Sequence, residues 1–187
     1  MNRMKDRNRL WDVVEAACRA IENDGRLRSA LRCAARCNDV IGLEATDAFA
    51  QGLRGWLGGW HLDDAAADGA MVLLAQPKVK YRVASSNSLP EQDCVAQLLG
   101  EMLSGERRRL SELRFQRLLR ADGVDERLQQ MRRAIALLEP PVHPLAVVEA
   151  WLDLHSELGR RRFARAYFTG LSVPDDTTTT TSTPDAA

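Results

Sequence analysis

The sequence lacks the features that mark secreted and membrane-spanning proteins. Its first residues, MNRMKDRNRLWD, contain no apolar run of the kind that a secretory signal peptide requires. No stretch approaches the roughly 20 apolar residues of a transmembrane helix. The four cysteines are too few for a disulfide-dense secreted domain and favour reduced thiols. We therefore expect a cytoplasmic protein that makes no membrane contact.

Motifs of catalytic sites are also missing. The sequence contains no HExxH motif, no phosphate-binding loop and no nucleophile elbow. Asp63 and Asp64 could suggest a metal nuclease, but they fit a helix start better. Cys33 and Cys37 are one helical turn apart, yet a metal site would need two more ligands and the three histidines are scattered. We expect no catalytic residue, no metal site and no cofactor.

Net charge is absent too, because 26 basic residues balance 26 acidic ones. This balance argues against a uniformly polybasic binder, but the charges are segregated along the chain. Residues 39–75 carry six acidic side chains and a single basic one, whereas residues 107–133 carry nine arginines and four acids. A neutral protein with such a basic region can still bind an anionic partner locally.

Val and Ile are few beside Leu, Ala and Arg, and this mixture favours helices over sheets. The clearest helical pattern is an apolar seam, typical of packing on another helix, formed by Val124, Leu128, Met131, Ile135 and Leu138. No strand pattern or internal repeat is evident. We predict an all-α fold of about eight or nine helices, over 8–22, 26–37, 46–60, 63–76, 91–105, 111–122, 124–138, 144–152 and 157–171.

Composition divides this chain into four parts. We predict an N-terminal helical bundle over 1–76 and a C-terminal bundle over 91–172, packed together. Between them, residues 77–90 are bounded by prolines and are predicted to form a basic loop or linker. Residues 173–187 are rich in Thr, and such a polar, low-complexity tail is expected to be disordered.

The segment SELRFQRLLRAD, residues 111–122, predicts an amphipathic helix with Ser111 as its N-cap. Its apolar side is opposite Arg114, Arg117 and Arg120, and Leu113 is exposed among these arginines. A guanidinium group stays charged, and its planar fork matches phosphate oxygens. Arginines three residues apart are about 4.5 Å apart along a helix, which suits successive phosphates of a strand. The alternative, and the more common meaning of such runs, is a solvated face paired with acidic neighbours.

Other basic groups strengthen the nucleic-acid interpretation if the fold brings them to one face. These groups are Arg28 with Arg32, Lys78 and Lys80 with Arg82, Arg107–Arg109, Arg132 with Arg133, and Arg160–Arg162 with Arg165. A face that combines several of them would bind a polynucleotide backbone with strongly salt-dependent affinity. Sequence spacing does not show whether they converge.

The order of these motifs resembles the CasB family, the small subunit of the type I-E CRISPR Cascade complex. The similarity rests on SELRFQRLLRAD, on QQMRRAIALLEPPVHPL and on RRRFARAYFTG. It extends to NDGRLRSALRC near the N-terminus, which is similar to that family's glycine followed by a leucine–arginine–arginine motif. Cys33 replaces the second arginine of that motif.

The resemblance implies a non-enzymatic helical protein, of which two copies line the inner side of the complex beside other Cascade subunits. The family stabilises the hybrid of guide RNA and target DNA, and the displaced DNA strand, through basic residues. By motif position, the implied contacts are Arg32, Arg114, Arg120, Arg132 and Arg133, and more loosely Arg160 and Arg161. Arg117, Lys78 and Lys80 are candidates from the charge pattern. The alternative function is a helical scaffold that binds proteins and no nucleic acid.

Overall fold

Amphipathic helices make up most of the chain in the computed structural model, which describes residues 3–57, 63–81, 94–103, 107–139 and 141–169. The α-helices are α1 (Arg3–Asn23), α2 (Gly25–Cys33), α3 (Glu44–Leu57), α4 (Asp64–Leu74), α5 (Val95–Gly100), α6 (Glu112–Arg120), α7 (Val124–Ala136), α8 (Pro144–Asp153) and α9 (Glu157–Thr169). The predicted all-α class is therefore confirmed for these residues. The predicted disordered tail, 173–187, lies outside them, as does most of the predicted linker, 77–90.

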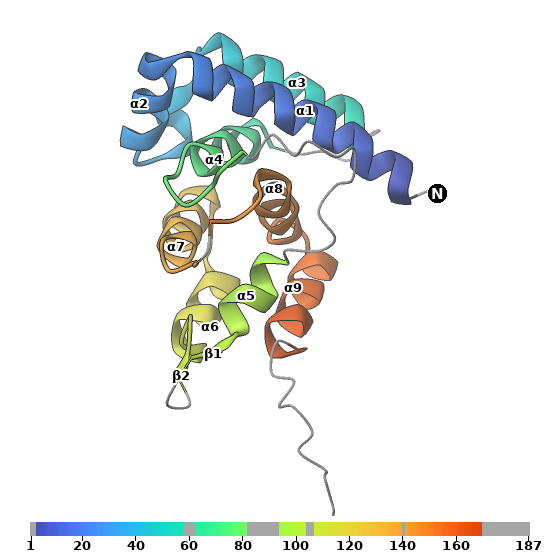
Figure 1. Cartoon of the computed structure of the whole chain (residues 1–187), viewed down its shortest axis with the longest axis vertical. Coiled ribbons are helices and arrows are strands. Elements are labelled where there is room, and N and C mark those ends of the chain that lie inside the picture. Colours follow the sequence, from blue (N-terminus) through green and yellow to red (C-terminus); the bar gives the residue numbers. More distant parts are fainter. Residues whose placement is uncertain (1–2, 58–62, 82–93, 104–106, 140, 170–187) are drawn as a thin grey trace, which may run out of the picture.

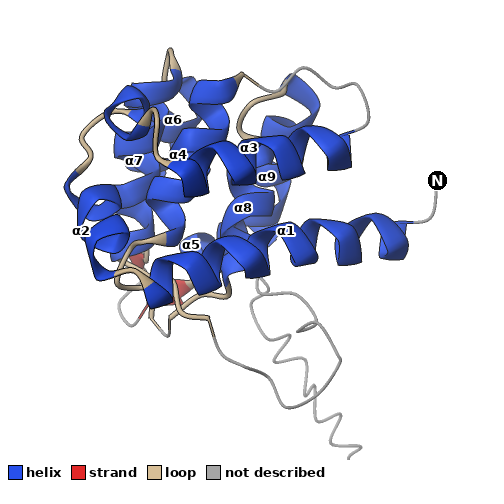
Figure 2. Cartoon of the chain, turned by 90° about the horizontal axis from the view of Figure 1, so that it is seen from above, coloured by secondary structure: helices blue, strands red, loops and turns tan. Residues whose placement is uncertain are grey.

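Helices α1–α4 lie together at one end of the molecule and α5–α9 at the other (Figure 1). Helix α4 packs against α7 and α8, and α1 also contacts α8. Viewed from above, α1 and α3 run roughly parallel across the molecule (Figure 2), and they contact each other. One continuous hydrophobic core joins the two groups, and the buried indole of Trp151 in α8 donates a hydrogen bond of 2.6 Å to the carbonyl of Ala66 in α4.

The apolar seam of α7 is confirmed. Leu128, Met131, Ile135 and Leu138 are each at most 1% exposed, and Val124 is half-buried. Pro144 opens α8, as its missing amide hydrogen suits a first helical position. In the described part of the chain, no helix combines the length and apolarity needed to cross a membrane.

The helix predicted over 26–37 is wrong at its C-terminal end, because α2 ends at Cys33 and a short 3-10 helix, η1 (Cys37–Val40), follows. The carboxylate of Asp39 accepts hydrogen bonds from the amides of residues 35 and 36, at 2.7 and 2.8 Å. Asp125 at the start of α7 accepts another from the amide of Cys37, at 2.8 Å. These acceptors capture amides that a continuing helix would need. Because α2 ends at Cys33, Cys33 and Cys37 are not one turn apart on a single helix as the spacing indicated; Cys33 is exposed and Cys37 is buried.

The helix predicted over 91–105 is also too long. Helix α5 ends at Gly100, and an antiparallel pair of two-residue strands follows, β1 (Met102–Leu103) and β2 (Arg107–Arg108). Gly100 lies so close to the carbonyl of Tyr167 in α9 that a Cβ atom there would overlap it. Glu101 then turns to an extended conformation, and its carbonyl accepts a hydrogen bond from the amide of Arg109.

Candidate nucleic-acid interface

Aromatic stacking holds α6 in its orientation. The ring of Phe115 is buried and parallel to that of Tyr167 in α9, with 3.6 Å between centroids, and it also stacks on Phe163 at 5.9 Å. Leu118 is equally buried, at 1% exposure. Because this side of the helix is fixed in the core, the opposite side must face solvent. Ser111 occupies the N-cap position, although its hydroxyl makes no capping hydrogen bond.

Arg114, Arg117 and Arg120 are exposed on that outer side, as the amphipathic pattern predicts. Within the described ranges, no carboxylate lies within 4.0 Å of their guanidinium groups. These three arginines therefore do not form a face that is neutralised by acidic neighbours, which was the alternative interpretation. They form an unpaired row of positive charge on a rigid helix.

A shallow hollow of about 270 Å³ lies between α6 and α7, and we call it the α6/α7 hollow. Its lining residues are Leu113, Gln116, Arg117, Arg120, Glu126 and Gln130. One carboxylate oxygen of Glu126 accepts a hydrogen bond of 2.9 Å from the amide of Asp122, in the turn before α7. Glu126 is therefore held by the backbone and forms no ion pair with the two arginines.

The arginine pair of α7 separates into two roles. Arg132 is half-buried, and its guanidinium donates hydrogen bonds to the carbonyls of Ala34 and Arg32, at 2.6 and 2.9 Å. A cation there satisfies free carbonyls at the C-terminal end of α2. Arg133 is exposed and, among described residues, has no ion-pair partner. By helical spacing, Arg133 shares the side of α7 on which Glu126 and Gln130 line the hollow.

Alanine substitutions of Arg132 and Arg133 are expected to have different effects on the stability of the fold. Arg132→Ala should lower the free energy of unfolding by about 2 kcal/mol, because two hydrogen bonds from a charged group are lost. Arg133→Ala, an exposed change, should leave it within about 0.5 kcal/mol of wild type and should weaken only nucleic-acid binding. Urea denaturation of both variants measures the difference. Equal stabilities would contradict the structural role of Arg132.

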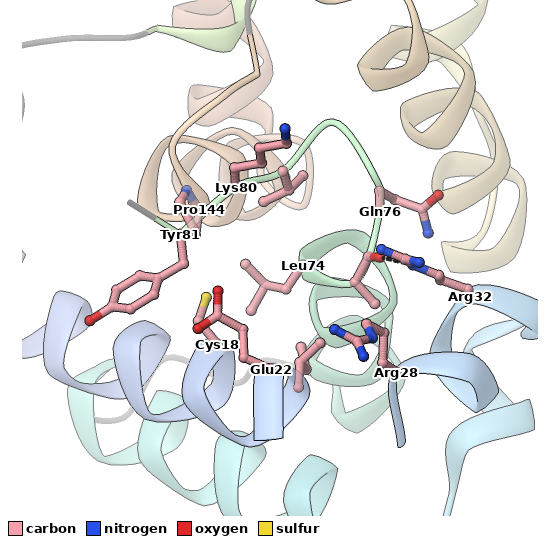
Figure 3. A pocket seen from close by; sticks show the side chains of 12 residues that line it. Cys18, Glu22, Arg28, Arg32, Leu74, Gln76, Lys80, Tyr81 and Pro144 are labelled. Atoms are coloured by element: carbon pink, nitrogen blue, oxygen red, sulfur yellow. Dashed lines mark hydrogen bonds between the residues drawn. The ribbon is translucent and has the colours of Figure 1, made fainter. Parts of the chain in front are cut away.

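A second hollow lies between α1, α2 and the turn that follows α4 (Figure 3). Arg28, Arg32 and Lys80 line it, together with Glu22 and Tyr81. The Nε of Arg32 donates a hydrogen bond of 2.7 Å to the carbonyl of Ala75. In Figure 3 the two arginines approach from the same helix, whereas the amine of Lys80 points away from them. Lys80 is exposed.

The remaining candidates are placed less favourably for an anion. Lys78 forms an ion pair with Glu139 at 3.5 Å, and Arg161 pairs with Glu157 one turn away in α9 at 2.5 Å. Arg160 is half-buried near Arg127, whose pKa is lowered mainly by burial and further by the charge of Arg160. The structure therefore does not bring these three residues to the α6/α7 hollow.

The structure places the candidates on α2, α6 and α7 in two separate groups. Arg117 and Arg120 line the α6/α7 hollow, and Arg132 contacts the backbone of Arg32 on the other side of α7. Arg28, predicted as part of a basic group but not as a contact residue, lines the second hollow with Arg32. Its spacing of four residues from Arg32, one turn along α2, is the sequence signal that identifies it. No group of three or more potential metal ligands occurs within the described residues.

Comparison with known proteins agrees with the predicted resemblance. The model of one protein family, CRISPR-associated protein Cse2, matches residues 26–168, well over half of the chain. No curated protein and no solved structure matches. The matched range contains α6 with its exposed arginines, the arginine pair of α7 and the arginines of α2. The chain therefore belongs to the CRISPR-associated protein Cse2, or CasB, family, the small subunits of the type I-E CRISPR Cascade complex.

Proposed function

We propose that this Cascade subunit is a non-catalytic protein that binds nucleic-acid backbone and stabilises the R-loop formed by guide RNA and target DNA. The observation that carries the proposal is the row of exposed arginines on α6, continued by Arg133 on α7, with no carboxylate partner in the described residues. Arg28 and Arg32 form a second basic group, in the hollow between α1, α2 and the turn after α4. Guide RNA, target strand and displaced strand are the proposed ligands.

The physical role of such a surface is to hold a strand in place. Sequence is read by base pairing between guide and target, so the protein needs only contacts to the backbone. Forming the hybrid is nearly balanced by the loss of the DNA duplex, and contacts from protein to backbone help to tip that balance. A second copy of the subunit and other Cascade subunits would continue the surface along the strands.

Acidic residues cluster on and near α4, away from the arginines of α6. Asp68 in α4 is buried, and its pKa is raised to about 6, first by burial and then by repulsion from Asp64, Asp47 and Asp63. Two of these acids begin α4 and one is in α3, which lies at the other end of the molecule from α6 (Figure 1). This acidic region repels polyanions. It therefore favours orientations in which α6 and α7 face a strand.

A gel-shift titration with salt tests the proposal. The full-length chain is expected to shift a labelled single-stranded oligonucleotide, with an affinity that falls steeply as salt rises. Arg117→Ala should reduce the slope of log K against log salt by about 0.7, the value for one phosphate contact to a single strand. Arg54→Ala is the matched control, since Arg54 is exposed on α3 and paired with Asp64; it should leave the slope unchanged.

One observation favours the alternative function, a helical scaffold that binds proteins and no nucleic acid. Leu158 and Phe168 of α9 are 64% and 41% exposed, a surface that could contact another protein. If the chain shifts no oligonucleotide at low salt but still enters the complex, the scaffold function replaces the proposed one.

A further inference from the structure

Leu113 is an exposed apolar side chain among the arginines of α6. It is 61% exposed although it stands on the arginine side of α6. Leu113, Arg117 and Arg120 follow one another at spacings of four and three residues, so they share one stripe of the helix. All three line the α6/α7 hollow. Backbone binding alone uses charge, and it gives no reason to expose a leucine on this stripe.

The lining of the hollow combines charged, neutral polar and apolar side chains, which a phosphate alone would not use. Glu126 is part of the lining, and its carboxylate repels phosphate from the hollow itself. The amides of Gln116 and Gln130 offer both donors and acceptors. Arg117 and Arg120 carry the positive charge of the hollow and attract a phosphate. The apolar surface suits the face of a base, the amide groups suit the polar atoms on its edge, and the nearby guanidinium groups suit the phosphate.

We infer that the α6/α7 hollow accepts one unstacked nucleobase of the strand whose backbone Arg117 and Arg120 hold, with the face of the base against Leu113. This inference rests on the proposed function and adds to it that the ligand at α6 is single-stranded. The hollow, about 270 Å³, is far larger than the space that a single bound water requires, so it has room for a larger flat group. A base in a duplex is stacked on both faces and cannot enter.

The contact with Leu113 is not selective for sequence, because every base has an apolar face. The amides of Gln116 and Gln130 can rotate to present either donor or acceptor, so they also tolerate different bases. The hollow would thus distinguish single strands from duplexes without distinguishing one sequence from another. This property suits a subunit that must act on any target.

Leu113→Ser tests the inference, because it removes apolar surface and leaves every charge in place. With a single-stranded oligonucleotide, we expect an affinity about fivefold lower than wild type, the effect of losing roughly 40 Å² of buried apolar surface at about 25 cal/mol per Å², and an unchanged salt slope. With a strand of equal length made only of abasic residues, Leu113→Ser and wild type should bind equally. Leu158→Ser is the matched control, because Leu158 is similarly exposed on α9; it should bind both strands as wild type does.

Four other outcomes separate this inference from the proposed function. If Leu113→Ser binds the intact strand like wild type while Arg117→Ala still loses salt dependence, the base contact is wrong and backbone binding stands. An equal loss on the abasic strand would mean that Leu113 acts through the backbone, and would overturn the inference. Normal DNA binding combined with failure to enter the complex would assign Leu113 to a protein contact. If Arg117→Ala bound the intact and the abasic strands as tightly as wild type, that result would contradict the proposed function itself.

Discussion

Replacing both Arg114 and Arg120 by alanine is expected to weaken target binding by the assembled complex by at least about tenfold. Each arginine is exposed and, in the described residues, unpaired, so each can form a charge-assisted bond to a phosphate that contributes about 1.5 kcal/mol or more. Because R-loop formation is nearly balanced, a loss of this size shifts the population of open target strongly. Permanganate footprinting of the displaced strand measures the open fraction directly.

The control for this variant removes the same charge elsewhere. Arg9 in α1 and Arg54 in α3 are both exposed and line neither hollow. Arg9→Ala with Arg54→Ala should leave the open fraction of target near the wild-type value. Gel filtration must show that both double variants enter the complex. A complex that contains Arg114→Ala and Arg120→Ala and opens target normally would contradict the role of α6.

Gly100→Ala is expected to lower the free energy of unfolding by about 3 kcal/mol, the upper end for an added core methyl group. The new Cβ would overlap the backbone carbonyl of Tyr167, and a backbone cannot move aside as easily as a flexible side chain. The effect should extend to α6, because Phe115 stacks on Tyr167. Urea denaturation measures the stability, and the variant should also bind single-stranded DNA less tightly near its unfolding midpoint.

Gly55→Ala provides the matched control for that variant. Gly55 is an exposed helical glycine of α3, and a Cβ atom there would meet no other atom within 4 Å. The change should therefore raise the free energy of unfolding by about 0.5 to 1 kcal/mol, since alanine is the better helix former. If both glycine variants were stabilised, the close approach of α5 to α9 would be wrong.

The parts of the fold that follow from local pattern could be predicted from the sequence. The seam of α7 and the two-sided character of α6 each depend on the spacing of apolar residues within one helix. The ends of α2 and α5 could not be predicted in this way. The first depends partly on Asp125, far away in sequence, and at the second Gly100 packs against a carbonyl of α9. Such contacts exist only once the chain has folded.

The same limit applies to the candidate interface. Arg132 and Arg133 are neighbours of identical type, and only the position of the α2 carbonyls assigns one of them to structure. Lys78 and Arg161 belong to basic runs, yet each has a carboxylate partner in the folded chain. The arginines of α6 differ because the helix amphipathicity itself directs them outward. Their placement was therefore predictable, and the absence of carboxylate partners in the described residues was not.

A structure of the assembled complex with an open target tests the central claim most directly. The claim is that unpaired arginines of α6 hold a nucleic-acid backbone. It predicts that guanidinium nitrogens of Arg114, Arg117 or Arg120 lie about 2.7 to 2.9 Å from phosphate oxygens, the range for charge-assisted hydrogen bonds. Another protein subunit covering α6, with its carboxylates against these arginines and no strand within reach, would contradict it.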